Sequence, residues 1–167
     1  MPALLNFVLF QFGWFAAVLG AAHAHALLGT LTVLLIIAWH LYAARNWRAE
    51  LQLLLCAALI GLCADTALAS SGWVQYSDPL MPAGLAPLWI IALWMLFATT
   101  LRLSLKWLQP HLLLGALCGA VGGPLAYLSG VRLGALTLPR AEAALIALAA
   151  LWMAATVLLL RMAQRHA

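Results

Sequence analysis

Six long apolar stretches follow one another along the chain, and each is close to the length that crosses a lipid bilayer. They cover residues 3–21, 26–43, 50–69, 88–105, 115–135 and 140–160. A helix needs about 20 consecutive apolar residues to span the hydrocarbon core. Because 67% of the 167 residues are hydrophobic and 7% are charged, no stretch is polar enough for a separate soluble domain. We therefore expect an all-α polytopic membrane protein, in which residues 1–167 form one compact bundle of six transmembrane helices.

The basic residues at the ends of the predicted spans indicate the orientation of the chain. Six share one side, namely Arg45, Arg48, Arg102, Lys106, Arg161 and Arg165, whereas Arg132 and Arg140 take the other. Because cytoplasmic loops are enriched in Lys and Arg, we expect both termini to be cytoplasmic. The net charge of +4 is scattered over the span ends. We therefore expect membrane lipids and other membrane proteins as partners, and no nucleic acid.

The fifth predicted span carries small residues at helical spacing. Gly115, Gly119 and Gly123 lie four residues apart and share one helix face, and Pro124 follows them directly. In a membrane, such a face lets a second helix approach closely, and a proline inside a helix removes a backbone hydrogen bond. We expect this helix at the centre of the bundle, in contact with several others and broken at Pro124.

Asp65 is the acidic residue that lies well inside a predicted span, where an ionisable group is costly unless it is paired or hydrated. On the expected topology, Asp65 lies in an outward-facing polar pocket that binds a ligand, a proton or a lipid headgroup. The residues of this pocket would be Asp65, His23, His25, Tyr127, Arg132 and Gln11. The structural alternative is an ion pair between Asp65 and Arg132.

Other polar side chains have simpler interpretations. We expect Glu50 to cap its helix, where the macrodipole favours a negative charge. We expect His40 to be a surface residue near the cytoplasmic boundary of the membrane. The mid-span tryptophans Trp94 and Trp152 fit core packing. His23 and His25 are two residues apart and do not share a helix face, and no HExxH or CxxC pattern is present. We expect no metal and no other cofactor.

The chain resembles an uncharacterised family of small six-helix bacterial inner-membrane proteins, a domain-of-unknown-function family. The resemblance rests on Asn6, Gln11 and Trp14, on Asp65, on the apolar and aromatic run from Pro87 to Trp107, and on the segment from Gly123 to Ala135. It implies a location in the bacterial inner membrane. It also implies a link to envelope lipid or fatty-acid modification, but no established chemistry.

Three functions fit these observations. The first is a lipid-handling protein, or an accessory subunit of a lipid-modifying assembly, with its pocket around Asp65. The second is a small permease or proton-coupled carrier in which Asp65 changes its charge. The third is a membrane-embedded enzyme, in which His23 or His25 acts as acid or base and Asp65 orients it. The substrate, the oligomeric state and the choice among these classes stay open.

Overall fold

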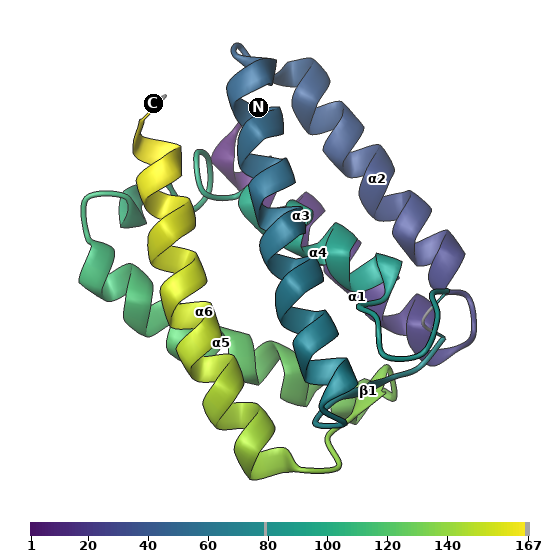
Figure 1. The fold of residues 1–167 in the computed structure, drawn as a ribbon. Coiled ribbons are helices and arrows are strands. Elements are labelled where there is room, and N and C mark those ends of the chain that lie inside the picture. The colour runs from purple at the N-terminus through teal and green to yellow at the C-terminus, as the bar shows by residue number, and fades with distance from the viewer. Residues whose placement is uncertain (79, 166–167) are drawn as a thin grey trace.

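The computed structural model describes residues 1–78 and 80–165, and these residues form six α-helices, one 3₁₀ helix and two short strands (Figure 1). The elements are α1 (Ala3–Ala22), α2 (Ala26–Ala43), α3 (Trp47–Ser70), β1 (Gln75–Tyr76), α4 (Leu88–Ala98), η1 (Lys106–Leu108), α5 (Leu112–Leu133), β2 (Leu136–Thr137) and α6 (Ala141–Gln164). Helices α1, α2, α3, α5 and α6 are each long and apolar enough to cross a membrane. The expected helical membrane bundle is therefore confirmed.

Helix α4 is shorter than the predicted span over residues 88–105. It ends at Ala98, and the chain continues as a series of turns as far as η1. The hydroxyl groups of Thr99 and Thr100 donate to the carbonyl oxygens of Leu96 and Phe97, at 2.7 and 2.6 Å. Such bonds compete with the helical backbone ladder. The fourth crossing of the bundle is therefore made by a short helix and the turns that follow it.

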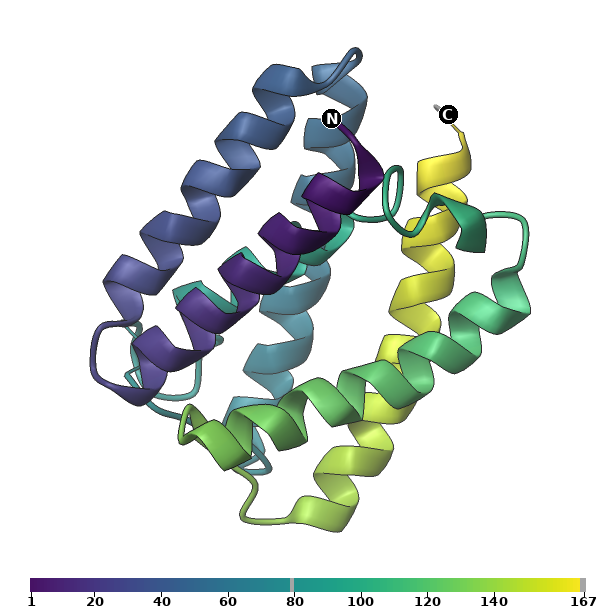
Figure 2. The same cartoon turned by 180° about the vertical axis from the view of Figure 1, so that it is seen from behind.

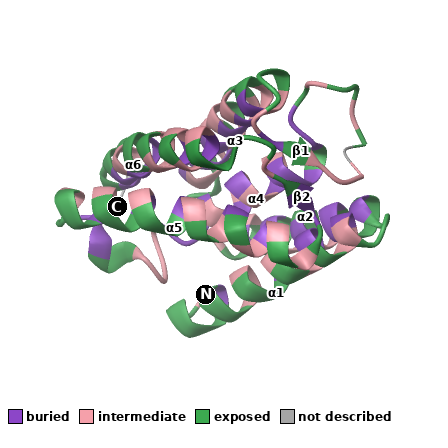
Figure 3. Ribbon diagram, turned by 90° about the horizontal axis from the view of Figure 1, so that it is seen from below, coloured by how far each residue is buried: buried purple, intermediate pink, exposed green. Residues whose placement is uncertain are grey.

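The centre of the bundle is α4, not α5 as the sequence suggested. Helix α4 is apolar on all sides, and it packs against α3, α2 and α1. Figure 3 shows buried residues gathered around it. Helix α5 packs mainly against α6, and its outer face exposes Leu113, Leu117, Val121 and Leu125. The prediction failed because a helix that is apolar all round is suited to burial on every side, whereas α5 has only one close-packing face.

That close-packing face of α5 lies against α6, which crosses it steeply (Figure 2). Gly115, Gly119 and Gly123 are buried there, and a Cβ atom at any of them would overlap with α6. The residues of α6 that they face are Trp152, Thr156 and Leu160. The expected break at Pro124 is absent, since α5 is continuous from Leu112 to Leu133.

The long loop between α3 and α4 is fastened to two other segments, β2 with the residue before it and the start of α2. Its strand β1 pairs antiparallel with β2, so that Tyr76 lies opposite Leu136. The amide of Ser77 donates to the carbonyl oxygen of Ala135 at 2.9 Å. A carboxylate oxygen of Asp78 accepts from the amide of Ala26 at 2.8 Å and so caps the start of α2. These contacts hold Tyr76 over the end of α3.

Candidate functional site

Asp65 lies at the junction of four segments. Its side chain is fully buried on α3. One carboxylate oxygen, Oδ1, accepts hydrogen bonds from the hydroxyl groups of Tyr76, at 2.5 Å, and of Tyr127. The other, Oδ2, accepts from the indole Nε1 of Trp94 at 2.7 Å. Three donors from β1, α4 and α5 therefore satisfy a carboxylate that is out of contact with water.

A glycine one turn before Asp65 makes this arrangement possible. A Cβ atom at Gly61 would overlap with the indole ring of Trp94. The missing side chain lets α4 approach α3 closely, and the indole N–H then reaches the carboxylate on the next turn. The pairing of β1 with β2 supplies Tyr76, and Tyr127 lies on the buried side of α5.

Tyr76 acts as a donor to this carboxylate at any ordinary pH. Burial, together with the neighbouring Tyr127 and the charge of Asp65, raises the pKa of Tyr76 well above its usual value. The phenol therefore keeps its proton.

The sequence grouped Asp65 correctly with Tyr127, but the alternative that it left open, an ion pair between Asp65 and Arg132, is wrong. Arg132 is exposed, and within residues 1–78 and 80–165 no Lys, Arg or His side chain bonds to Asp65. The carboxylate is held by neutral donors instead. The sequence did not predict that Tyr76 and Trp94 bond to Asp65. Their roles depend on the pairing of β1 with β2 and on the close approach of α4 at Gly61, and both require the positions of the helices.

His23, His25 and Gln11 do not join the cluster. All three are exposed. The Nδ1 atoms of His23 and His25 bond to the carbonyl oxygens of Leu19, at 2.9 Å, and of His23, at 2.5 Å. An acid–base pair of either histidine with Asp65 requires hydrogen-bond reach, and the structure shows no such contact. The expectation of an open polar pocket around Asp65 is likewise wrong, because Asp65 is 0% exposed.

An apolar cavity lies beside this cluster. It has a volume of about 530 Å³ and extends from Leu108 in η1 to Leu136 in β2. Its wall includes Phe10, Gln11, Trp14 and Phe15 of α1, Trp94 and Phe97 of α4, Gly122 and Tyr127 of α5, and Trp152 and Thr156 of α6. Because several of these residues of α1 and α5 are exposed, the cavity reaches the outer surface of the bundle between those helices.

Trp94 and Tyr127 belong both to the cavity wall and to the Asp65 cluster. The Trp94 ring also stacks on that of Trp152, with centroids 4.1 Å apart. Asp65 therefore orients Trp94 and Tyr127, two residues of the cavity wall, through hydrogen bonds on the side away from the cavity. It does not itself line the cavity.

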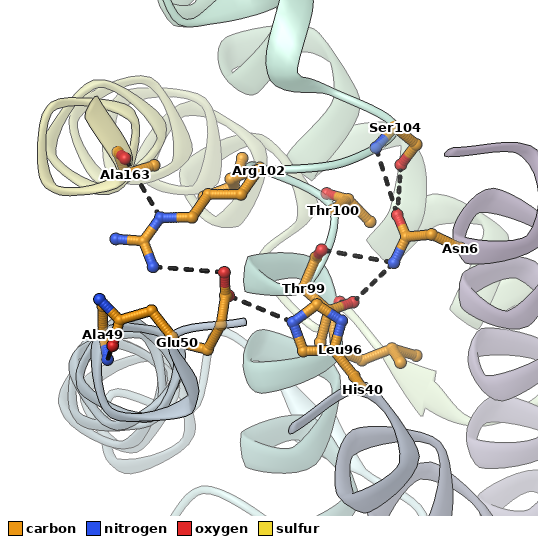
Figure 4. Close-up of polar contacts among 12 residues, drawn as sticks. Asn6, His40, Ala49, Glu50, Leu96, Thr99, Thr100, Arg102, Ser104 and Ala163 are labelled. Atoms are coloured by element: carbon orange, nitrogen blue, oxygen red, sulfur yellow. Dashed lines mark hydrogen bonds and ion pairs between the residues drawn. The ribbon is translucent and has the colours of Figure 1, made fainter. Parts of the chain in front are cut away.

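A second polar cluster lies at the opposite end of α4 (Figure 4). Asn6 is buried, and its amide donates to the carbonyl oxygen of Thr99 at 3.3 Å. The oxygen of the same amide accepts from the hydroxyl of Ser104 at 2.6 Å. Asn6 therefore links α1 by hydrogen bonds to the turns that follow α4.

Glu50 joins the same end of the bundle, where its partners are His40 and Arg102. Its carboxylate lies 3.1 Å from Nε2 of His40 and 3.3 Å from a guanidinium nitrogen of Arg102. Arg102 also donates to the carbonyl oxygen of Ala163, at 3.1 Å, near the end of α6. The placement of His40 at the surface is wrong, since it is 3% exposed. Asn46, and not Glu50, accepts the capping bond of α3.

Comparison with known proteins places the chain in one family. The family described as "Protein of unknown function (DUF2878)" matches residues 3–158. Neither a curated protein nor a solved structure matches the chain. Within residues 1–78 and 80–165, no group of three or more His, Cys, Asp or Glu side chains is arranged to hold a metal ion.

Proposed function

Since the chain belongs to the DUF2878 family of proteins of unknown function, we propose its function from its own geometry: it binds a membrane lipid in the cavity between α1 and α5. The observation that carries this proposal is the apolar wall of that cavity. Its volume of about 530 Å³ falls within the range of about 300–1,000 Å³ that is typical of ligand sites.

The shape and position of the cavity support a lipid as its occupant. It extends along most of the length of the bundle and reaches the face where bulky apolar side chains such as Phe15 and Leu125 are exposed. A molecule already dissolved in the bilayer reaches such an opening without crossing water. A polar solute would find few partners there, since among the described lining residues none is Lys, Arg, Asp, Glu or His.

The proposal includes the setting of the protein. We place it in the bacterial inner membrane with both termini in the cytoplasm, as an accessory subunit that holds lipid for an envelope lipid-modifying or fatty-acid-modifying assembly. Its small size supports a binding role. The excess of basic residues at one set of span ends supports the orientation.

Filling the cavity tests the proposal. A Cβ atom at Gly122 would meet no other atom within 4 Å, and Gly122 lines the cavity. Gly122→Phe therefore adds a ring at the cavity wall from a position where the Cβ atom meets no neighbour. The matched control is Val121→Phe, because the neighbouring Val121 is 59% exposed and does not line the cavity.

We expect lipid extracted from purified Gly122→Phe protein, quantified by mass spectrometry, to fall at least about tenfold below that of the wild type, which corresponds to about 1.4 kcal/mol of binding free energy. Val121→Phe should retain the wild-type amount. Equal lipid in all three proteins contradicts the proposal.

A carrier that uses Asp65 is the second candidate. It is favoured by one observation, a buried intramembrane carboxylate without a cation partner among the described residues. Flux into proteoliposomes under a pH gradient, abolished by Asp65→Asn, would support it. Absence of flux in the wild type removes it.

A further inference from the structure

Three polar atoms of the cavity-lining residues have no hydrogen-bond partner. They are the indole Nε1 atoms of Trp89 and Trp152 and the hydroxyl oxygen of Thr156. Trp89 is 1% exposed and Thr156 is 2% exposed. Buried polar groups are nearly always paired, so unpartnered groups around one cavity indicate a missing partner.

Thr156 differs from Thr30 and Thr32, two helical threonines whose hydroxyl groups are satisfied locally. Thr30 and Thr32 donate to the carbonyl oxygens of Ala26 and Leu28, at 2.8 and 2.9 Å. Thr156 forms no such bond, and its hydroxyl faces the bare backbone of Gly119, another lining residue. The hydroxyl is therefore unpaired and buried in the wall of the cavity.

The chemistry of these groups limits the ligand. An indole N–H only donates, so the ligand must present acceptor oxygens. A hydrocarbon has none. A charged headgroup is also excluded from the cavity, because no charged side chain among the described lining residues would compensate it.

We propose that the cavity binds an uncharged lipid that carries carbonyl oxygens, with Thr156, Trp152 and Trp89 as the donors. The three atoms are sealed from water in the cavity wall, so binding requires side-chain rotation that turns them toward the ligand. Carbonyl oxygens of this kind occur in acylglycerol esters and in prenylated quinones. The inference rests on the proposed lipid-binding function and specifies the class of lipid.

Retention of defined lipids by the purified full-length protein tests this inference. The protein is incubated in nanodiscs of ether-linked phospholipid, which lacks ester carbonyls, doped with dioleoylglycerol, with a short-chain ubiquinone or with squalene. The lipid retained after repurification is then measured by mass spectrometry. We expect dioleoylglycerol or ubiquinone to be retained at least about fivefold more than squalene, as one net hydrogen bond predicts. The stronger of the two identifies the source of the carbonyl.

Three variants localise the effect to the hydroxyl of Thr156. Thr156→Val keeps the shape and removes the donor, so retention of the carbonyl lipid should fall about fivefold while that of squalene stays unchanged. Thr156→Ser should restore binding, and Thr32→Val, which removes a locally bonded hydroxyl, should have no effect.

Equal retention of squalene and the carbonyl lipids by the wild type overturns the inference and leaves the lipid-binding function intact. Equal loss of all three lipids in Thr156→Val, with normal binding in Thr156→Ser, also overturns it. Failure of the wild type to retain any of the lipids overturns the proposed function itself.

Discussion

Asp65 connects α3 to β1, α4 and α5 through a single side chain. Its carboxylate accepts from Tyr76, Trp94 and Tyr127, and it has no contact with water. A carboxylate in an apolar interior is tolerated only when donors replace its hydration shell. The side chain therefore stabilises the arrangement of the segments, and it orients two aromatic residues of the cavity wall.

Removing one of these donors should destabilise the bundle measurably. We expect Tyr127→Phe to lower the free energy of unfolding by about 1–2 kcal/mol, because it deletes one interhelical hydrogen bond to a carboxylate. Tyr42 is 84% exposed and serves as the control. Tyr42→Phe should change stability by less than about 0.5 kcal/mol. Equal unfolding midpoints of the two variants in detergent would show that the Asp65 cluster contributes little.

The sequence identified part of this cluster. The cost of burying a carboxylate singled out Asp65, and depth in the membrane brought Tyr127 to it. The prediction that Arg132, His23 and His25 join Asp65 was wrong, because depth in the membrane alone does not determine which helices face each other. Trp94 was read as core packing, and its second role depends on Gly61, whose missing side chain admits the indole ring.

At the scale of elements, α5 packs closely against α6 through Gly115, Gly119 and Gly123. A Cβ atom at Gly119 would overlap with the backbone carbonyl of Trp152, and backbone cannot move aside as a flexible side chain can. Gly122, three residues further along α5, meets nothing. The two glycines therefore differ in what an added methyl group does.

We expect Gly119→Ala to destabilise the protein by about 1–3 kcal/mol through overpacking. Gly122→Ala should instead stabilise it by up to about 0.5–1 kcal/mol, because alanine loses less backbone entropy in a helix. Unfolding midpoints in the same detergent measure both. A result in which both variants behave alike would contradict the close contact of α5 with α6.

The positions of the helices were largely predictable, because six apolar stretches of bilayer length leave few other solutions. The identity of the central helix was not. Glycines at i, i+4 and i+8 indicate that one partner comes close. A central position requires a helix without an exposed face, and after Leu88 no residue of α4 is exposed. The early end of α4 follows from local hydroxyl bonds that compete with the helix.

At the scale of the whole molecule, the six helices return the chain to the end of the bundle where it began (Figure 2). Figure 1 and Figure 2 show the start of α1 and the end of α6 at the same end of the bundle. The cavity is a property of this scale, because α1, α4, α5 and α6 each supply part of its wall. No single stretch of sequence contains it, which is why it could not be predicted before the helices were placed.

The orientation of the chain in the membrane can be tested by introducing one cysteine at a time and labelling it with a membrane-impermeant maleimide. Arg48 and Ser71 are exposed at opposite ends of α3. In sealed vesicles with the cytoplasmic face outward, we expect Arg48→Cys to react and Ser71→Cys to react only after permeabilisation. The unmodified chain gives the background from Cys56, Cys63 and Cys118. The opposite pattern would invert the topology.

The measurement that tests lipid binding most directly is photocrosslinking with a diacylglycerol that carries a diazirine in its acyl chain, followed by mapping of the labelled residues. We predict labels on the cavity-wall residues Trp14, Phe97 and Trp152, and their loss in Gly122→Phe but not in Val121→Phe. Labels confined to outward-facing residues such as Leu35 and Ile146, 72% and 71% exposed, and unchanged by Gly122→Phe, would contradict a lipid site in the cavity.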